Sequence, residues 1–133
     1  MNEITIPYHL AIPTVICIVG LATILLFQRR LFARNKRLWT SVSVFLVVYV
    51  LVVGSSTFYD IYYQWDLNRY DLDKDGFFGG QEITRDQEAA MQRLTSDVGR
   101  NLSFITGLLL AGIISTTVYL FGRLRPLIKR DRQ

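Results

Sequence analysis

The sequence contains long stretches that lack every charged side chain. No Asp, Glu, Lys or Arg occurs from Leu10 to Phe27, from Leu38 to Phe58 or from Leu102 to Gly122, which are runs of 18, 21 and 21 residues. A surface helix of a soluble protein carries charged residues along one face, and these runs show no such face. Because a bilayer core of ~30 Å requires about 20 apolar residues as helix, the sequence predicts three transmembrane helices. Three buried helices of a soluble bundle are the less favoured alternative.

Cysteine and histidine are nearly missing. The chain has one cysteine, Cys17, and one histidine, His9. A single cysteine excludes an intrachain disulfide or a cysteine cluster, so Cys17 is expected to be a small packing residue. A haem would need an axial partner that a lone histidine does not have, so His9 is expected at the membrane interface. Nucleophile–base pairs, phosphate-binding loops and zinc spacings are also missing. The protein is therefore expected not to be an enzyme, and no small-molecule substrate is evident.

Basic residues are missing before the first apolar run and abundant after it. The opening segment MNEITIPYH has no Lys or Arg, whereas a signal peptide begins with a basic region, so a retained span is expected. The connection 28–38 holds five bases and no acid, and the tail 123–133 holds five bases and one acid. The positive-inside rule places both on the cytoplasmic side. The N-terminus and the segment 59–101, called the outer segment here, are then expected outside.

The net charge of +4 conceals two faces of opposite sign, because the outer segment contains nine acids and five bases. We therefore read the basic clusters as orientation signals that also attract anionic lipid. They do not indicate a nucleic-acid partner.

Carboxylates are concentrated in one stretch of the outer segment, DLDKDGFFGGQE, which runs from Asp71 to Glu82 and is called the acidic loop here. Asp71, Asp73 and Asp75 occupy alternate positions, and Gly76 follows them. Carboxylates this close repel one another unless a cation lies among them, and Ca²⁺ prefers six to eight oxygen ligands. The pattern indicates a calcium site, and a solvated acidic turn is the alternative.

The acidic loop resembles the calcium loop of the EF-hand family, D-x-[DN]-x-[DN]-G-x5-E, at every defining position. The resemblance covers the loop and its flanking helices, roughly a quarter of the chain. It implies bound Ca²⁺, a bend at Gly76 and a water molecule at Gly79. The implied metal ligands are side-chain oxygens and one backbone carbonyl: Asp71, Asp73, Asp75, Phe77 through its carbonyl, and Glu82 through both oxygens.

EF-hands usually work in pairs, and this chain has one. Phe78 stands where the family packs two loops together, so it requires cover from a second copy, another protein or the chain's own N-terminal segment. On the exit side, Thr84 and Gln87 form a capping box that would start the exit helix late. Asp86 lies where the family pattern would place a hydrophobic residue. The entering helix carries an aromatic cluster, which fits an interfacial belt or a partner surface: Tyr59, Tyr62, Tyr63, Trp65 and Tyr70.

The third apolar run carries small residues at intervals of four. Gly107, Ala111 and Ser115 form one row, and Gly112 with Thr116 begins another. Small residues let helices approach closely in a membrane. We expect partner contacts at the acidic loop and along the row Gly107–Ala111–Ser115.

The predicted fold is all-α: three transmembrane helices, with one extracytoplasmic EF-hand-like helix-loop-helix between the second and third. Its parts are 1–27 (outside N-terminus and first span), 28–38 (basic cytoplasmic loop), 39–58 (second span), 59–101 (outer module), 102–122 (third span) and 123–133 (basic cytoplasmic tail). The expected function is a calcium-binding integral membrane protein of a bacterial inner membrane, acting as an accessory or assembly subunit of a larger complex. The alternatives are a calcium-modulated membrane regulator and a small homo-oligomeric channel lined by the hydroxyls of 55–57 and 115–117.

Overall fold

The computed structural model describes residues 4–130, and all regular secondary structure in that range is helical. The predicted all-α class is therefore confirmed. The helices are α1 (Tyr8–Asn68), the short 3-10 helix η1 (Gly80–Glu82), α2 (Arg85–Thr95), α3 (Val98–Asn101) and α4 (Ser103–Arg130). Residues 1–3 and 131–133, the ends of the predicted N-terminal segment and basic tail, lie outside the described residues.

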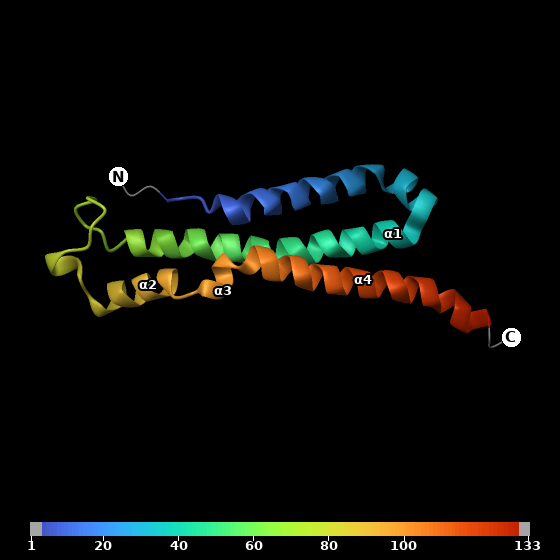
Figure 1. Ribbon diagram of the computed structural model, residues 1–133. Helices are drawn as coiled ribbons and strands as arrows, with labels where there is room; N and C mark the ends of the chain where they lie inside the picture. Colours follow the sequence, from blue (N-terminus) through green and yellow to red (C-terminus); the bar gives the residue numbers. More distant parts are fainter. Residues whose placement is uncertain (1–3, 131–133) are drawn as a thin grey trace.

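The long helix α1 is broken at one residue. Asn35 has φ −155° and ψ 81°, which is not helical, and Figure 1 shows the chain reversing direction in this region. The two halves run side by side: the Thr5 amide donates to Gln64 Oε1 at 2.8 Å, and a Cβ at Gly20 would lie 3.3 Å from Leu46 Cδ1. Asn35 Oδ1 accepts from the Leu38 amide at 3.3 Å and so caps the second half. The connection 28–38 is thus helical apart from this break.

Two described helices, α1 and α4, are long and apolar enough to cross a membrane by length and composition. The predicted number of three spans is not confirmed by this count, because the first two apolar runs lie in the single helix α1, on either side of Asn35. Large apolar side chains point outward along both helices; Leu26 is 81% exposed and Phe121 70%. An apolar surface of this extent indicates contact with lipid or protein.

Helix α4 packs along the second half of α1, and small residues form the contact (Figure 1). A Cβ at Gly107 would lie 2.8 Å from Val53 Cγ2, and Ala111 is fully buried. The Ser41 hydroxyl donates to the Ser115 carbonyl at 2.5 Å. The row Gly107–Ala111–Ser115 is therefore covered by α1 within the chain, which corrects the expectation that a partner contacts it. Cys17 is buried in the same core, as predicted for a packing residue.

The two glycines of α4 provide a matched test of this packing. Gly107→Leu should destabilise the protein by about 1–3 kcal/mol, because the new side chain would overpack the contact with Val53. Gly112→Leu should change stability by less than about 0.5 kcal/mol, since no atom lies within 4 Å of a Cβ there. Denaturation of both variants in mixed detergent micelles measures the difference, and equal effects would contradict this packing.

Candidate metal centre

The acidic loop is held between two helices. The second half of α1 continues through the predicted entering helix and ends at Asn68, and the Tyr70 amide still donates to the Leu67 carbonyl at 3.0 Å. After η1, Ile83 and Thr84 are extended. Thr84 Oγ1 accepts from the Gln87 amide at 3.2 Å, so α2 begins at Arg85. The predicted late start of the exit helix is confirmed, with Thr84 as its cap.

Three of the predicted metal ligands gather at one point. Asp71, Asp73 and Glu82 each offer a carboxylate oxygen, and these oxygens all lie within 4.8 Å of one another. Ca²⁺ ligands lie about 2.3–2.6 Å from the ion, so two oxygens of one site are separated by at most about 5 Å. These three carboxylates could therefore hold one metal ion, and calcium stays the prediction of the resemblance.

Asp75 is not part of this group of carboxylates. Its Oδ1 accepts from the Phe77 amide at 2.7 Å, while its own amide donates to Asp73 Oδ1 at 3.2 Å. Its role as a ligand, like that of the Phe77 carbonyl, remains a prediction from the resemblance. Phe77 itself has a side chain that is 78% exposed.

Backbone amides of the loop donate hydrogen bonds to the carboxylates. Glu82 Oε1 accepts from the Leu72 amide at 2.6 Å and the Asp73 amide at 3.3 Å, and Glu82 Oε2 accepts from the Gly79 amide at 3.2 Å. Asp71 Oδ2 accepts from the Gly76 amide at 3.0 Å. Hydrogen bonds of this kind hold the carboxylate oxygens in fixed positions, as a metal site requires of its ligands.

The loop turns at Gly76, which has φ +86°. Glycine adopts this left-handed conformation without the steric penalty that a Cβ imposes. The predicted bend at Gly76 is confirmed. The turn lets the backbone curl around Asp71 and Glu82, which are only 6% and 8% exposed, while Asp73 remains exposed.

The pKa of Asp73 lies above its ordinary value. The hydrogen bond from the Asp75 backbone lowers it, but desolvation and repulsion from Asp75, Glu82 and Asp71 raise it by more. Repulsion of this kind is what a bound cation removes.

Calcium affinity should therefore depend on pH through Asp73. An Asp whose folded pKa is raised takes up a proton as pH falls through that value, and Ca²⁺ binds the deprotonated form. The affinity should be constant near neutral pH and should begin to fall at a higher pH than an isolated Asp would give. Calorimetric titration at several pH values measures this. The steepest part of the fall should move to lower pH in Asp73→Asn, and an unmoved profile would contradict the role of Asp73.

A buried ion pair that the sequence analysis missed anchors the outer module. Arg100 Nε donates to Asp60 Oδ1 at 3.1 Å, with side chains 3% and 12% exposed. The guanidinium also donates to the carbonyls of Arg93 and Leu94 at the end of α2, and it lies 5.1 Å from the Tyr63 ring centroid. The sequence indicates this pair only through the positions of its two residues. Asp60 follows the second apolar run by two residues, and Arg100 precedes the third by two.

The pair extends into a network that reaches the N-terminal segment. Asp60 Oδ2 accepts from Gln64 Nε2 at 2.9 Å, and Gln64 Nε2 also donates to the Thr5 carbonyl at 2.9 Å. Asp97 Oδ1 accepts from the Arg100 amide at 2.9 Å and caps α3. One set of polar contacts thus joins the N-terminal segment, α1, α2 and α3.

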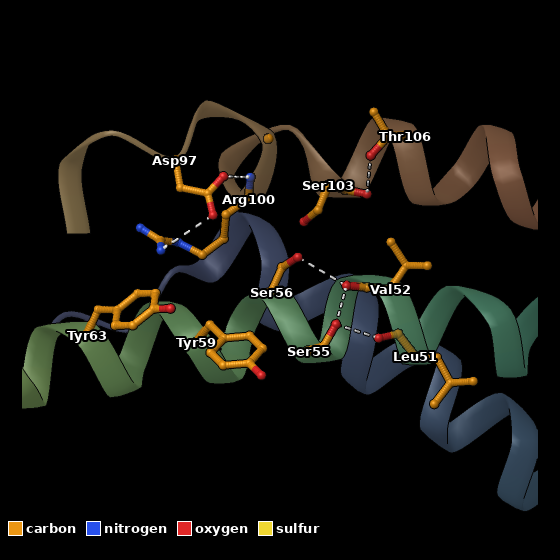
Figure 2. Close-up of a pocket in the computed structure, with 11 residues that line it drawn as sticks. Leu51, Val52, Ser55, Ser56, Tyr59, Tyr63, Asp97, Arg100, Ser103 and Thr106 are labelled. Atoms are coloured by element: carbon orange, nitrogen blue, oxygen red, sulfur yellow. Dashed lines mark hydrogen bonds and ion pairs between the residues drawn. The ribbon is translucent and has the colours of Figure 1, made fainter. Parts of the chain in front are cut away.

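Beside this network lies a cavity of about 580 Å³, called the outer cavity here. Figure 2 shows hydroxyl groups from α1 and α4 along it, with Asp97 and Arg100 toward one end. Ser55 and Ser56 donate to carbonyls of their own helix at 2.7 and 3.1 Å. Ser103 is 3% exposed, and its hydroxyl has no hydrogen-bond partner within the part of the chain that the structure describes. The outer cavity therefore offers a buried hydroxyl to an incoming polar group.

Phe78 lies partly buried beside the start of the exit helix. It lines a shallow hollow of about 460 Å³ together with Ile83, Gln87 and Met91. The N-terminal segment instead bonds to Gln64 through Thr5. No residue of 4–7 lines this hollow, and cover of Phe78 by a second copy or by another protein stays a prediction.

Comparison with known proteins supplies no relative from which a function could be transferred. No protein-family model, no curated protein and no solved structure matches the chain. The function of this protein is therefore inferred from the residues of the acidic loop and from the helices that hold it.

Proposed function

We propose that the protein is a calcium-binding integral membrane protein that acts as an accessory or assembly subunit of a larger membrane complex. The observation that carries the proposal is the convergence of Asp71, Asp73 and Glu82 within 4.8 Å on a loop whose amides orient them. Asp75 and the Phe77 carbonyl would complete the ligand set of the EF-hand resemblance. When bound, Ca²⁺ supplies a positive charge that neutralises the carboxylates and fixes the loop.

The proposed membrane placement has three spans: the two halves of α1 and the helix α4. The break at Asn35 supports it, because the halves run side by side and five bases stand around the reversal. The positive-inside rule then places the reversal and the C-terminus in the cytoplasm, and the acidic loop outside. We propose the inner membrane of a bacterium as the location.

The proposed role of calcium is to stiffen the outer module. Extracellular calcium modules bind with Kd of about 10⁻⁴–10⁻³ M, so an outward-facing site is filled where calcium is millimolar. The ion would join the start of the loop, at Asp71, to its end, at Glu82. The Asp60–Arg100 network holds the helices on either side of the loop together. Mg²⁺ should bind more weakly, since it demands a compact octahedral geometry.

The partner surface is proposed at the outer end of α1. Phe58 stacks on Tyr62 with ring centroids 6.3 Å apart, and Tyr62 contacts Trp65 at 5.9 Å. These rings are 64%, 44% and 48% exposed. Exposed aromatic rows favour protein interfaces, and the outer cavity with Ser103 lies along the same helix. A homo-oligomer would use the same surface.

Cysteine labelling tests the placement. In a Cys17→Ser background, Glu88→Cys on the exposed face of α2 should react with a membrane-impermeant maleimide in intact cells. Gln133→Cys should react only after the cytoplasmic side is opened. The reverse pattern would overturn the orientation and favour a cytosolic calcium sensor.

Purification from native membrane in mild detergent tests the role. Larger subunits should co-purify, and a chelator should loosen the complex before the spans unfold. A stable monomer under every condition would contradict the proposal. A self-complex that conducts ions in liposomes would favour the channel alternative.

A further inference from the structure

The cytoplasmic end of the proposed placement carries five bases that pair with no acid among the residues whose side chains the structure describes. Five bases stand between positions 29 and 37: Arg29, Arg30, Arg34, Lys36 and Arg37. The ion pairs Asp66–Arg69, Asp60–Arg100 and Asp97–Arg100 do not involve these bases. The described acids all lie in the outer segment, at the other end of the helices. The positive charge at this end of the protein therefore attracts an anion from outside the chain.

Two of these bases face a hollow beside the break in α1. The hollow measures about 540 Å³, and Arg30 and Arg34, one helical turn apart, line it with Asn35 and Trp39. Guanidinium groups bind phosphate oxygens through two parallel hydrogen bonds. The second half of α1 begins at this point, so the positive end of its dipole adds to the attraction. We call this feature the inner hollow.

An apolar groove lies beside the inner hollow. The groove measures about 490 Å³ and runs between the two halves of α1, along Gly20, Thr23, Ile24 and Leu46. Leu31 and Trp39 line both the inner hollow and the groove, so the two spaces are adjacent. A basic hollow beside an apolar groove matches the form of a phospholipid, with its headgroup at the surface and an acyl chain in the membrane.

We propose that this end of the protein holds one anionic phospholipid. Its phosphate lies against Arg30 and Arg34, and one acyl chain lies in the groove past Trp39. An anionic headgroup is preferred to a zwitterionic one, because Arg30 and Arg34 beside the phosphate would repel the ammonium of a zwitterionic lipid. Anionic lipids are enriched in cytoplasmic leaflets. The inference rests on the proposed membrane placement but not on calcium binding.

Native mass spectrometry of the full chain in mild detergent tests the site with phosphatidylglycerol and phosphatidylcholine of the same acyl chains. Wild type should retain one phosphatidylglycerol in preference to phosphatidylcholine. Arg30→Gln/Arg34→Gln should lose about tenfold in phosphatidylglycerol affinity. The control Arg29→Gln/Lys36→Gln removes the same charge outside the inner hollow and should stay within about twofold. Thr23→Phe, which fills the groove, should also weaken binding.

Three results would overturn the inference: equal losses in the two double variants, equal binding of the two lipids, or displacement of the lipid by inorganic phosphate at equal concentration. Carbonate extraction and calcium calorimetry on the same proteins show whether a negative result contradicts the lipid site alone or also the proposed function. A chain that resists carbonate and binds calcium, but shows no lipid preference, contradicts only the lipid site. A chain that carbonate extracts contradicts the membrane placement.

Discussion

Asp60→Asn should lower the free energy of unfolding of the outer module far more than any surface substitution. The change leaves the Arg100 guanidinium buried beside an uncharged amide, with its side chain only 3% exposed. Breaking a buried ion pair by removing one partner costs about 3–5 kcal/mol. Asp97, whose Oδ2 lies 3.9 Å from Arg100 Nη1 and whose side chain is 53% exposed, compensates only part of the remaining charge. The loss should appear as a lower unfolding temperature and as faster hydrogen exchange of the α2 amides.

The matched control for this prediction is Arg69→Gln. Arg69 pairs with Asp66 at 3.7 Å, and its side chain is 64% exposed. Exposed pairs contribute less than about 1 kcal/mol, so this variant should melt close to wild type. The double variant Asp60→Leu/Arg100→Met should recover part of the loss, since replacing a whole buried pair by apolar side chains is often tolerated. Similar melting of Asp60→Asn and Arg69→Gln would contradict the anchoring role of the pair.

Glu82→Gln should weaken calcium binding by about a hundredfold, because affinity in such loops follows the number of charged ligands. The substitution removes one charge while keeping an oxygen that accepts from the Leu72 or Gly79 amide. The fold of the loop should therefore persist and the ion should leave. Equilibrium dialysis with radioactive calcium measures the effect.

Two further variants make the Glu82 result specific. Asp71→Ala should weaken binding similarly, since Asp71 belongs to the same carboxylate group. Glu88→Gln removes the same charge from an exposed position in the first turn of α2 and should leave affinity within about twofold. Wild-type affinity in Glu82→Gln, or an equal loss in Glu88→Gln, would refute the assignment of the site.

The helical elements were predictable because their signals are local. The charge-free runs predict apolar helices, Thr84 predicts the start of α2, and Gly76 predicts the bend of the loop. Each depends on residues within a few positions of one another. Sequence alone also brought Asp71, Asp73 and Glu82 into one predicted site, and the structure gathers these three.

The break in α1 and the tertiary contacts were not predictable in the same way. After the first apolar run, seven more residues stay helical before Asn35. The predicted loop 28–38 is therefore reduced to the single non-helical residue Asn35. The pairing of Asp60 with Arg100 depends on α4 lying antiparallel to the second half of α1. Neither residue belongs to a motif. The row Gly107–Ala111–Ser115 signals close helix contact, but the pattern does not say whether the other helix belongs to the same chain. The contact of Gly107 with Val53 supplies that answer.

Calorimetric titration of the chelator-stripped protein in mild detergent measures directly whether the acidic loop binds calcium. We expect one saturable Ca²⁺ site per chain with Kd between about 10⁻⁶ and 10⁻³ M, and weaker binding of Mg²⁺. In Glu82→Gln we expect the affinity from the isotherm to be about a hundredfold weaker. Absence of saturable binding in wild type, or an unchanged isotherm in Glu82→Gln, would contradict calcium binding by the acidic loop.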